Sequence, residues 1–198
     1  MDTASMDTAS MDTAHAVLDD VVVVFRAANA ALAASIAAAV AFYDTRMAEF
    51  DTGSLPVHLD AERTAHTSAI AELACATLRP AGAVQAHLDI WWGSRAIYRD
   101  MFTVGTISLE VLRTIRDHTM GAPAAIIAAL EPDIVLATAH FTPTRLGKEI
   151  DRMITALDPD WDIRARTRAA AKKNVRLTRL PRGMARQSAT IGARDAAE

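Results

Sequence analysis

The stretch Asp158–Thr190 reads DPDWDIRARTRAAAKKNVRLTRLPRGMARQSAT, and the interpretation of the rest of the chain depends on it. Its first half predicts a helix, because Asp158 can act as the N-cap and Pro159 suits the first helical position. Asn174 can end that helix in a left-handed conformation. No acid separates the bases inside it, which are Arg164, Arg166, Arg168, Lys172 and Lys173.

The second half of the stretch predicts a small β-hairpin. Val175–Leu180 alternates apolar and polar residues with the period of a half-buried strand. Residues 181–183, Pro-Arg-Gly, are typical of a turn, and Met184–Thr190 can return as the second strand. We therefore expect a basic helix followed by a basic hairpin.

This stretch resembles the domain of unknown function 222, also called the 13E12 repeat family, in the run from Asp158-Pro159 to VRLTRLPRGMARQSA. Two upstream segments are similar to the family as well. Ala69–Leu88 resembles its helix–proline–helix segment, and Met101–Thr119 resembles its L-x-x-G-x-I segment with the helix that follows. The resemblance extends over roughly Arg63–Glu198 and contains no catalytic motif.

In that family the domain usually precedes an HNH nuclease module, which has not begun where this sequence stops. The resemblance therefore implies a non-catalytic helical domain of an HNH endonuclease-like protein, associated with nucleic acid. Two alternatives stay open. The chain is then either a protein–protein interaction or dimerisation module, or an inactive truncated fragment of a mobile-element protein.

The composition favours a mainly α fold. Of the 198 residues, 51% are hydrophobic and only 5% are aromatic, and alanine, the best helix former, is abundant. A chain of this length can bury a sizeable core. We expect a multi-helix domain with a long N-terminal helix and the small C-terminal hairpin.

The net charge of −3 conceals a strong polarity along the chain. Residues 1–163 carry 22 acids and 11 bases, net −11, whereas residues 164–198 carry 10 bases and 2 acids, net +8. The basic end can fold onto the acidic body of its own chain or bind nucleic acid. Charge alone leaves these two alternatives open.

If the basic end binds DNA, its side chains contact phosphates without reading the sequence. Arg164, Arg168 and Lys172 step by four residues and share one helix face. A solvated helix face is the alternative. The candidate residues for non-specific DNA binding are Arg164, Arg168, Lys172, Lys173, Arg176 and Arg182.

The N-terminal region divides into a repeat, a helix and a linker. Residues 1–14 repeat the unit MDTAS, and we predict that they are disordered. Residues 15–50 predict one long helix, residues 51–62 a linker containing Gly, Ser and Pro, and residues 63–198 the helical domain.

The long helix carries a heptad stripe, in which apolar positions step by four and three. A polar residue at one such position, Asn29, can fix the register and number of paired helices. The stripe either packs on the domain of its own chain or forms a dimerising coiled coil. Its residues are Leu18, Val22, Phe25, Asn29, Leu32 and Ile36.

Further helices are predicted along the chain. Ser108 is expected to cap the helix Leu109–His118, and Pro132 is expected to divide Ala124–Ala139 into two short helices. The other expected helices are Asp60–Leu78, Ala81–Trp92, Ser94–Val104 and Thr142–Leu157.

Three patterns have a functional and a structural interpretation, and the structural one is favoured each time. Ile70–Leu78 and Ala83–Trp92 have the lengths of a helix-turn-helix, but the second helix offers Gln85, His87 and Asp89, a poor set for reading bases. Asp117-His118 matches the start of an HNH core, but the companion Asn and His do not follow. The acids Asp158, Asp160 and Asp162 are explained by a helix start.

We therefore predict no catalytic residue, metal site, cofactor or small-molecule substrate. The one cysteine, Cys75, is expected to be a buried, inert thiol. No membrane span is expected, because charged residues interrupt the long helix and its clean apolar run, Ala30–Tyr43, is shorter than the roughly 20 residues a bilayer needs. The N-terminus lacks the basic segment of a signal peptide, which predicts a cytoplasmic location.

Overall fold

A computed structural model describes the backbone of residues 3–51, 61–171, 174–179 and 185–190, and the side chains of residues 15–49 and 62–167. These ranges are mainly helical, which confirms the predicted α class. The helices are α1 (Thr3–Asp51), α2 (Ala61–Thr77), α3 (Ala81–Gly93), α4 (Ala96–Thr103), α5 (Leu109–Thr119), α6 (Ala124–Thr138), α7 (Pro143–Leu157) and α8 (Trp161–Ala171).

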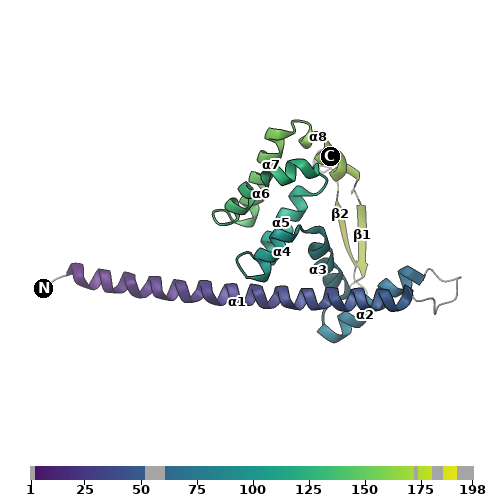
Figure 1. The fold of residues 1–198 in the computed structure, drawn as a ribbon, viewed down its shortest axis with the longest axis horizontal. Coiled ribbons are helices and arrows are strands. Elements are labelled where there is room, and N and C mark those ends of the chain that lie inside the picture. Colours follow the sequence, from purple (N-terminus) through teal and green to yellow (C-terminus); the bar gives the residue numbers. More distant parts are fainter. Residues whose placement is uncertain (1–2, 52–60, 172–173, 180–184, 191–198) are drawn as a thin grey trace.

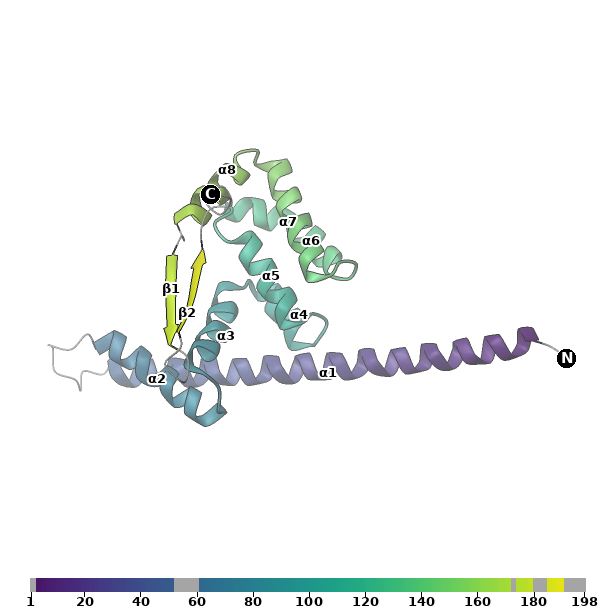
Figure 2. The same ribbon diagram turned by 180° about the vertical axis from the view of Figure 1, so that it is seen from behind.

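The helices form a body that stands on one part of a single long helix (Figure 1). The C-terminal half of α1 contacts α2, α3 and α4, while α5 and α6 pack against α7. The N-terminal half of α1 extends away from the body, as the view from behind also shows (Figure 2). The molecule therefore consists of a helical body and a projecting arm.

Two apolar clusters hold the body together. The larger one is centred on fully buried side chains of α4, α5 and α7, among them Phe102, Leu112 and Ile150, and it includes Ala33 and Ile36 of α1. The smaller one joins α2 and α3 through Ile70, Leu73, Val84 and Leu88. Because α1 contributes to the larger cluster, its C-terminal half is an integral part of the fold.

The cap predicted for α5 is confirmed: the Ser108 hydroxyl accepts a hydrogen bond of 3.2 Å from the backbone N–H of Val111. The division predicted at Pro132 is wrong, because α6 continues through that proline. Leu130 and Ile134 on either side are both buried in the core. Their packing keeps the chain helical although Pro132 removes one backbone hydrogen bond.

The last helix also begins later than predicted. Asp158 is the C-cap of α7, and α8 starts at Trp161, whose N–H donates to the carbonyl of Asp158 at 3.0 Å. Trp161 is only 2% exposed and anchors the first turn of α8 in the core. Burial of this large ring outweighs the capping preference of Asp158 and Pro159.

Two extended segments follow, β1 (Asn174–Arg179) and β2 (Ala185–Thr190). They pair antiparallel, with Asn174 opposite Thr190 and Arg179 opposite Ala185. The predicted turn at residues 181–183 lies outside the described residues, so the closed hairpin stays a prediction. At the other end, α1 begins at Thr3, within the repeat for which we predict disorder, and no side chain of that repeat is described.

Candidate interaction surfaces

We call the predicted heptad stripe of α1, from Leu18 to Ile36, the domain-facing stripe. It divides into a part that packs on the body and a part that does not. Its C-terminal members, Leu32 and Ile36, pack against the core of their own chain. Asn29 is half-buried at the edge of the body. Leu18, Val22 and Phe25, in contrast, are 58%, 41% and 67% exposed. Intramolecular packing therefore accounts for only half of this stripe.

Gly105, in the turn after α4, lies at the boundary between the two parts. It has a left-handed φ of +78°, and a side-chain carbon there would overlap the backbone carbonyl of Arg26 in α1. Only glycine permits both this conformation and this approach. The contact marks the edge of the body, so residues 17–28 are called the projecting part of α1.

Polar contacts fix the other end of α1. A hydrogen bond of 2.7 Å joins the Tyr43 hydroxyl to Nδ1 of His66 in α2. Arg46 donates to Glu72 of α2 at 2.8 Å, and this hydrogen bond holds the pKa of the Glu72 carboxyl below its usual value. These contacts and the apolar cluster together seat the C-terminal half of α1 on α2.

A second heptad stripe lies on the flank of α1, about 100° round the helix from the domain-facing stripe, and we call it the outer stripe. It follows the same four–three spacing, displaced by one residue toward the N-terminus. Every member is exposed: Val17, Val21, Val24, Ala28, Ala31, Ser35, Ala38 and Phe42. The spacing of this stripe is as regular as that of the first, but its side chains are smaller than Leu18, Phe25 and Leu32 of the domain-facing stripe.

By length and composition alone, α1 is able to cross a membrane. The segment His15–Glu49 contains a window of mean hydropathy 1.9, of which only 11% is buried. Its C-terminal half, however, is held by α2, α3 and α4. Of this apolar segment, only residues 15–28, about 21 Å of helix, lie beyond the body, less than the ~30 Å of a bilayer core. If α1 crossed a membrane, its C-terminal half would have to leave the contacts with α2, α3 and α4 seen here.

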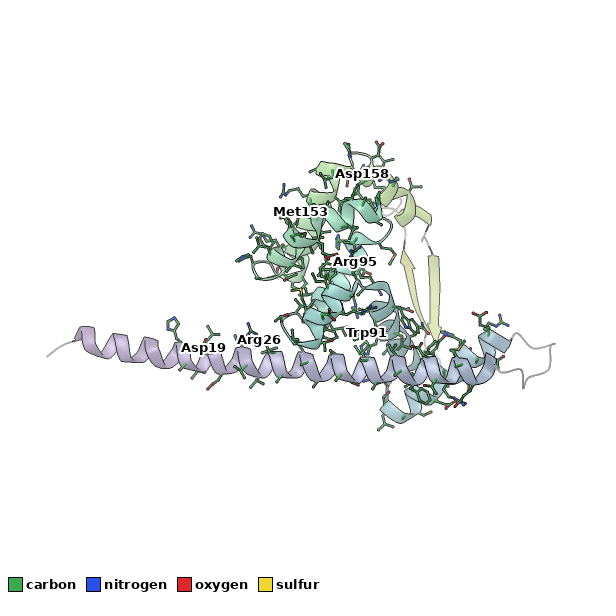
Figure 3. The ribbon with its side chains drawn as sticks, in the orientation of Figure 1. Asp19, Arg26, Trp91, Arg95, Met153 and Asp158 are labelled. Atoms are coloured by element: carbon green, nitrogen blue, oxygen red, sulfur yellow. The ribbon has the colours of Figure 1, made fainter. Side chains whose placement is uncertain are left out.

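The basic segment starts at the end of the body farthest from α1, where Figure 3 shows Asp158. Arg164 is exposed and pairs with Asp158, and Arg166 is 3.8 Å from Asp162. Arg168 lies on α8 and Arg176 on β1, but their side chains are outside the described residues, as are Lys172, Lys173 and Arg182. Whether these six bases share a surface therefore stays a prediction.

The helix-turn-helix candidate is embedded in the fold. Helix α3 contacts α1, α2 and α5, and it buries Val84, Leu88 and Ile90. Gln85 donates to Asp89 at 2.7 Å. Burial lowers the pKa of His87, and the positive charges of Arg79 and Arg113 lower it further. These contacts agree with a structural helix pair.

Asp117 and His118 also have structural partners. The Arg116 guanidinium donates to Asp117 at 2.8 Å, and Nδ1 of His118 lies 2.9 Å from Asp151 of α7. Gly147 of α7 lies beneath the His118 ring. Among the described residues, no three His, Cys, Asp or Glu side chains come together as metal ligands.

A hollow of about 260 Å³, lined by Arg95 and Arg116, lies where the connection between α3 and α4 meets the end of α5 and the start of α6. Both arginines are paired with acids, Arg95 with Glu131 at 2.6 Å and Arg116 with Asp117. Burial raises the pKa of the neighbouring Tyr98 to about 12, so its phenol stays protonated near neutral pH. The charges of both arginines beside the hollow are therefore balanced by acids.

Cys75 corrects an expectation, because its side chain is exposed. Helix α2 turns Ile70 and Leu73 into the smaller cluster, and Cys75 falls on the opposite, solvent side. The helix was predicted correctly, but the choice of its buried face was not.

The fold and these surfaces define a mainly helical protein with a projecting helical arm. The model of the family described as "Domain of unknown function (DUF222)" matches residues 98–198, just over half of the chain. The chain belongs to this family, which confirms the resemblance, although the match starts at Tyr98 rather than near Arg63. No curated protein and no solved structure matches.

Proposed function

We propose that this chain is a non-catalytic helical module that joins another protein chain through α1. One observation carries the proposal. Seven large apolar side chains of the projecting part are exposed, by 41% to 67%: Val17, Leu18, Val21, Val22, Val23, Val24 and Phe25. Covering each fully is worth about 1.5–3 kcal/mol, and soluble monomers rarely expose so continuous an apolar surface.

A photo-crosslinking amino acid tests this proposal in cells that express the full chain. Placed at Val24, it should form an adduct with a protein chain. The matched control is Arg152, which is well exposed on α7 and should form none. If Val24 yields no more adduct than Arg152, α1 is not a docking element and the proposal fails.

The second candidate function is non-specific association with nucleic acid, and the charge distribution supports it. Residues 164–198 carry a net charge of +8. This segment begins in α8, at the end of the body away from α1, and β1 and β2 then run back toward α1 and α2 (Figure 1). Bases on such a segment suit phosphate contacts, which carry affinity without sequence preference. Pairing of Arg164 and Arg166 with acids weakens this candidate relative to the first.

The resemblance to the domain of unknown function 222 adds a context to both candidate functions. It implies that such a domain works beside an HNH nuclease module, so the module proposed here would assemble or position that activity in the cytoplasm. This extension rests on analogy within the family. A plasmid-nicking assay on the purified chain with Mg²⁺, Mn²⁺ or Zn²⁺ checks the non-catalytic part, and metal-dependent nicking that is lost in His118→Ala would contradict it.

A further inference from the structure

The outer stripe of α1 identifies the kind of partner that the helix accepts. We infer that the partner is a second copy of this chain, whose α1 packs antiparallel along the same stripe. This inference rests on the proposed function. It adds which chain binds to α1, which face of α1 is covered, and the relative direction of the two helices.

The length of the stripe is the first argument. From Val17 to Phe42 it covers more than three heptads, the extent at which paired helices become stable. Its members are all exposed along roughly 38 Å of helix. A long, straight helix offers a matching surface, and among the described helices of this chain only α1 is long enough, since the next longest, α2, has 17 residues against 49 in α1.

The sizes of the side chains fit an antiparallel pair. With a two-fold axis between residues 29 and 30, Ala28 faces Ala31 of the partner subunit at the centre. In the same pairing, Val24 faces the partner's Ser35, Val21 faces the partner's Ala38, and Val17 faces the partner's Phe42. Small residues lie where two crossing helices are closest and larger ones where they diverge. A parallel pair instead stacks Phe42 on its own copy.

Charge supports the same direction. Figure 3 shows Asp19 on the part of α1 beyond the body, and Asp20 follows it at the flank of the outer stripe. A parallel pair brings the acids of both chains to the same level, where they repel each other. An antiparallel pair moves the two acidic ends apart and also opposes the helix dipoles favourably.

The body leaves room for this partner. Ala33 and Ile36, the buried positions of α1, face the core, whereas Ala31, Ser35 and Ala38 are exposed. Ser35 also borders a hollow lined by Leu73 of α2 and Val84 of α3. A second α1 along the outer stripe therefore covers exposed surface of α1 and passes the edge of α2 and α3 near Ser35.

Cysteine pairing tests the direction. Cys75 is first replaced by Ser, because it is exposed and would pair nonspecifically. Chains with Val17→Cys and chains with Phe42→Cys, separately tagged, are then oxidised alone and mixed. We expect a cross-linked dimer only in the mixture. Equal cross-linking of either chain alone indicates parallel helices, and no cross-link in the mixture excludes the stripe. Either result overturns the inference.

Sedimentation velocity tests the face with two matched substitutions. Ala28→Glu lies on the outer stripe, and Ala41→Glu places the same charge on an exposed position away from it. The unmodified chain and Ala41→Glu should sediment as dimers, and Ala28→Glu as a monomer whose melting temperature no longer depends on protein concentration. If the unmodified purified chain is a monomer while Val24 still forms protein adducts in cells, this inference fails and the proposed function stands.

Discussion

The backbone carbonyl of Arg26 lies directly against Gly105, and this contact fixes where α1 leaves the body. Gly105→Ala should lower the free energy of unfolding by at least about 2 kcal/mol, because both the left-handed φ and the overlap with a backbone atom oppose a side chain. Thermal and denaturant melts measure the loss.

Gly82→Ala is the matched control, because a side-chain carbon there would meet no atom within 4 Å. It should leave stability unchanged or raise it by about 0.5 kcal/mol. Equal melts of the two variants would show that the Arg26–Gly105 contact does not hold α1.

The second prediction concerns Gly147 and His118. A methyl group on Gly147 would lie 2.5 Å from Nε2 of His118, so Gly147→Ala must displace the ring and break its 2.9 Å contact with Asp151. We expect a loss of about 1 kcal/mol that largely disappears when His118 is already Ala. Additive losses in this double-mutant cycle would place the strain elsewhere.

Leu78 provides a prediction of the opposite sign. It follows α2 with a φ of 53° and is 93% exposed, so its side chain gains no packing for the strained conformation. Leu78→Gly should therefore stabilise the protein by about 0.5–1 kcal/mol. Leu78→Ala keeps the strain and should change nothing, so stabilisation by Ala as well would trace the effect to the side chain instead.

Helices were predictable from the sequence wherever local chemistry decided them. Ser108 caps α5 because its hydroxyl reaches Val111, and Thr142 precedes Pro143 at the start of α7 as expected. Pro132 and Trp161 were not predictable in the same way. Each is decided by distant partners in the core, which outweigh the local preference for a break or a cap.

The candidate surface of α1 was predictable only in part. Two heptad stripes run along the same helix, one starting at Leu18 and the other at Val17, and periodicity does not say which one the body covers. The approach of Gly105 to Arg26, between segments far apart in sequence, decides it. For the basic residues, the sequence pattern is clear, but it cannot be compared with the structure because the side chains from Arg168 onward lie outside the described residues.

The fourth prediction concerns pH. Burial lowers the pKa of His87 below its ordinary value of 6.5, so the unfolded chain takes up a proton more readily than the folded one. Stability should thus be complete well above pH 6.5 and fall as the pH drops below it. His87→Gln should reduce the dependence of the melting temperature on pH in this range. An unchanged slope in His87→Gln would assign the pH dependence to other groups.

The last prediction separates the two uses of the basic segment. If Arg168 and Lys172 contact phosphates, binding to DNA should be weak, independent of sequence and steeply salt-sensitive, and replacing both with Ala should lower the slope of log K against log salt by about two units. Alanine preserves the helix, so the loss reports charge alone. If the segment instead docks on the acidic body, the double substitution should lower the melting temperature, with little DNA affinity in the unmodified chain. A salt titration and a thermal melt on both proteins decide, and no binding together with an unchanged melt would leave the face merely solvated.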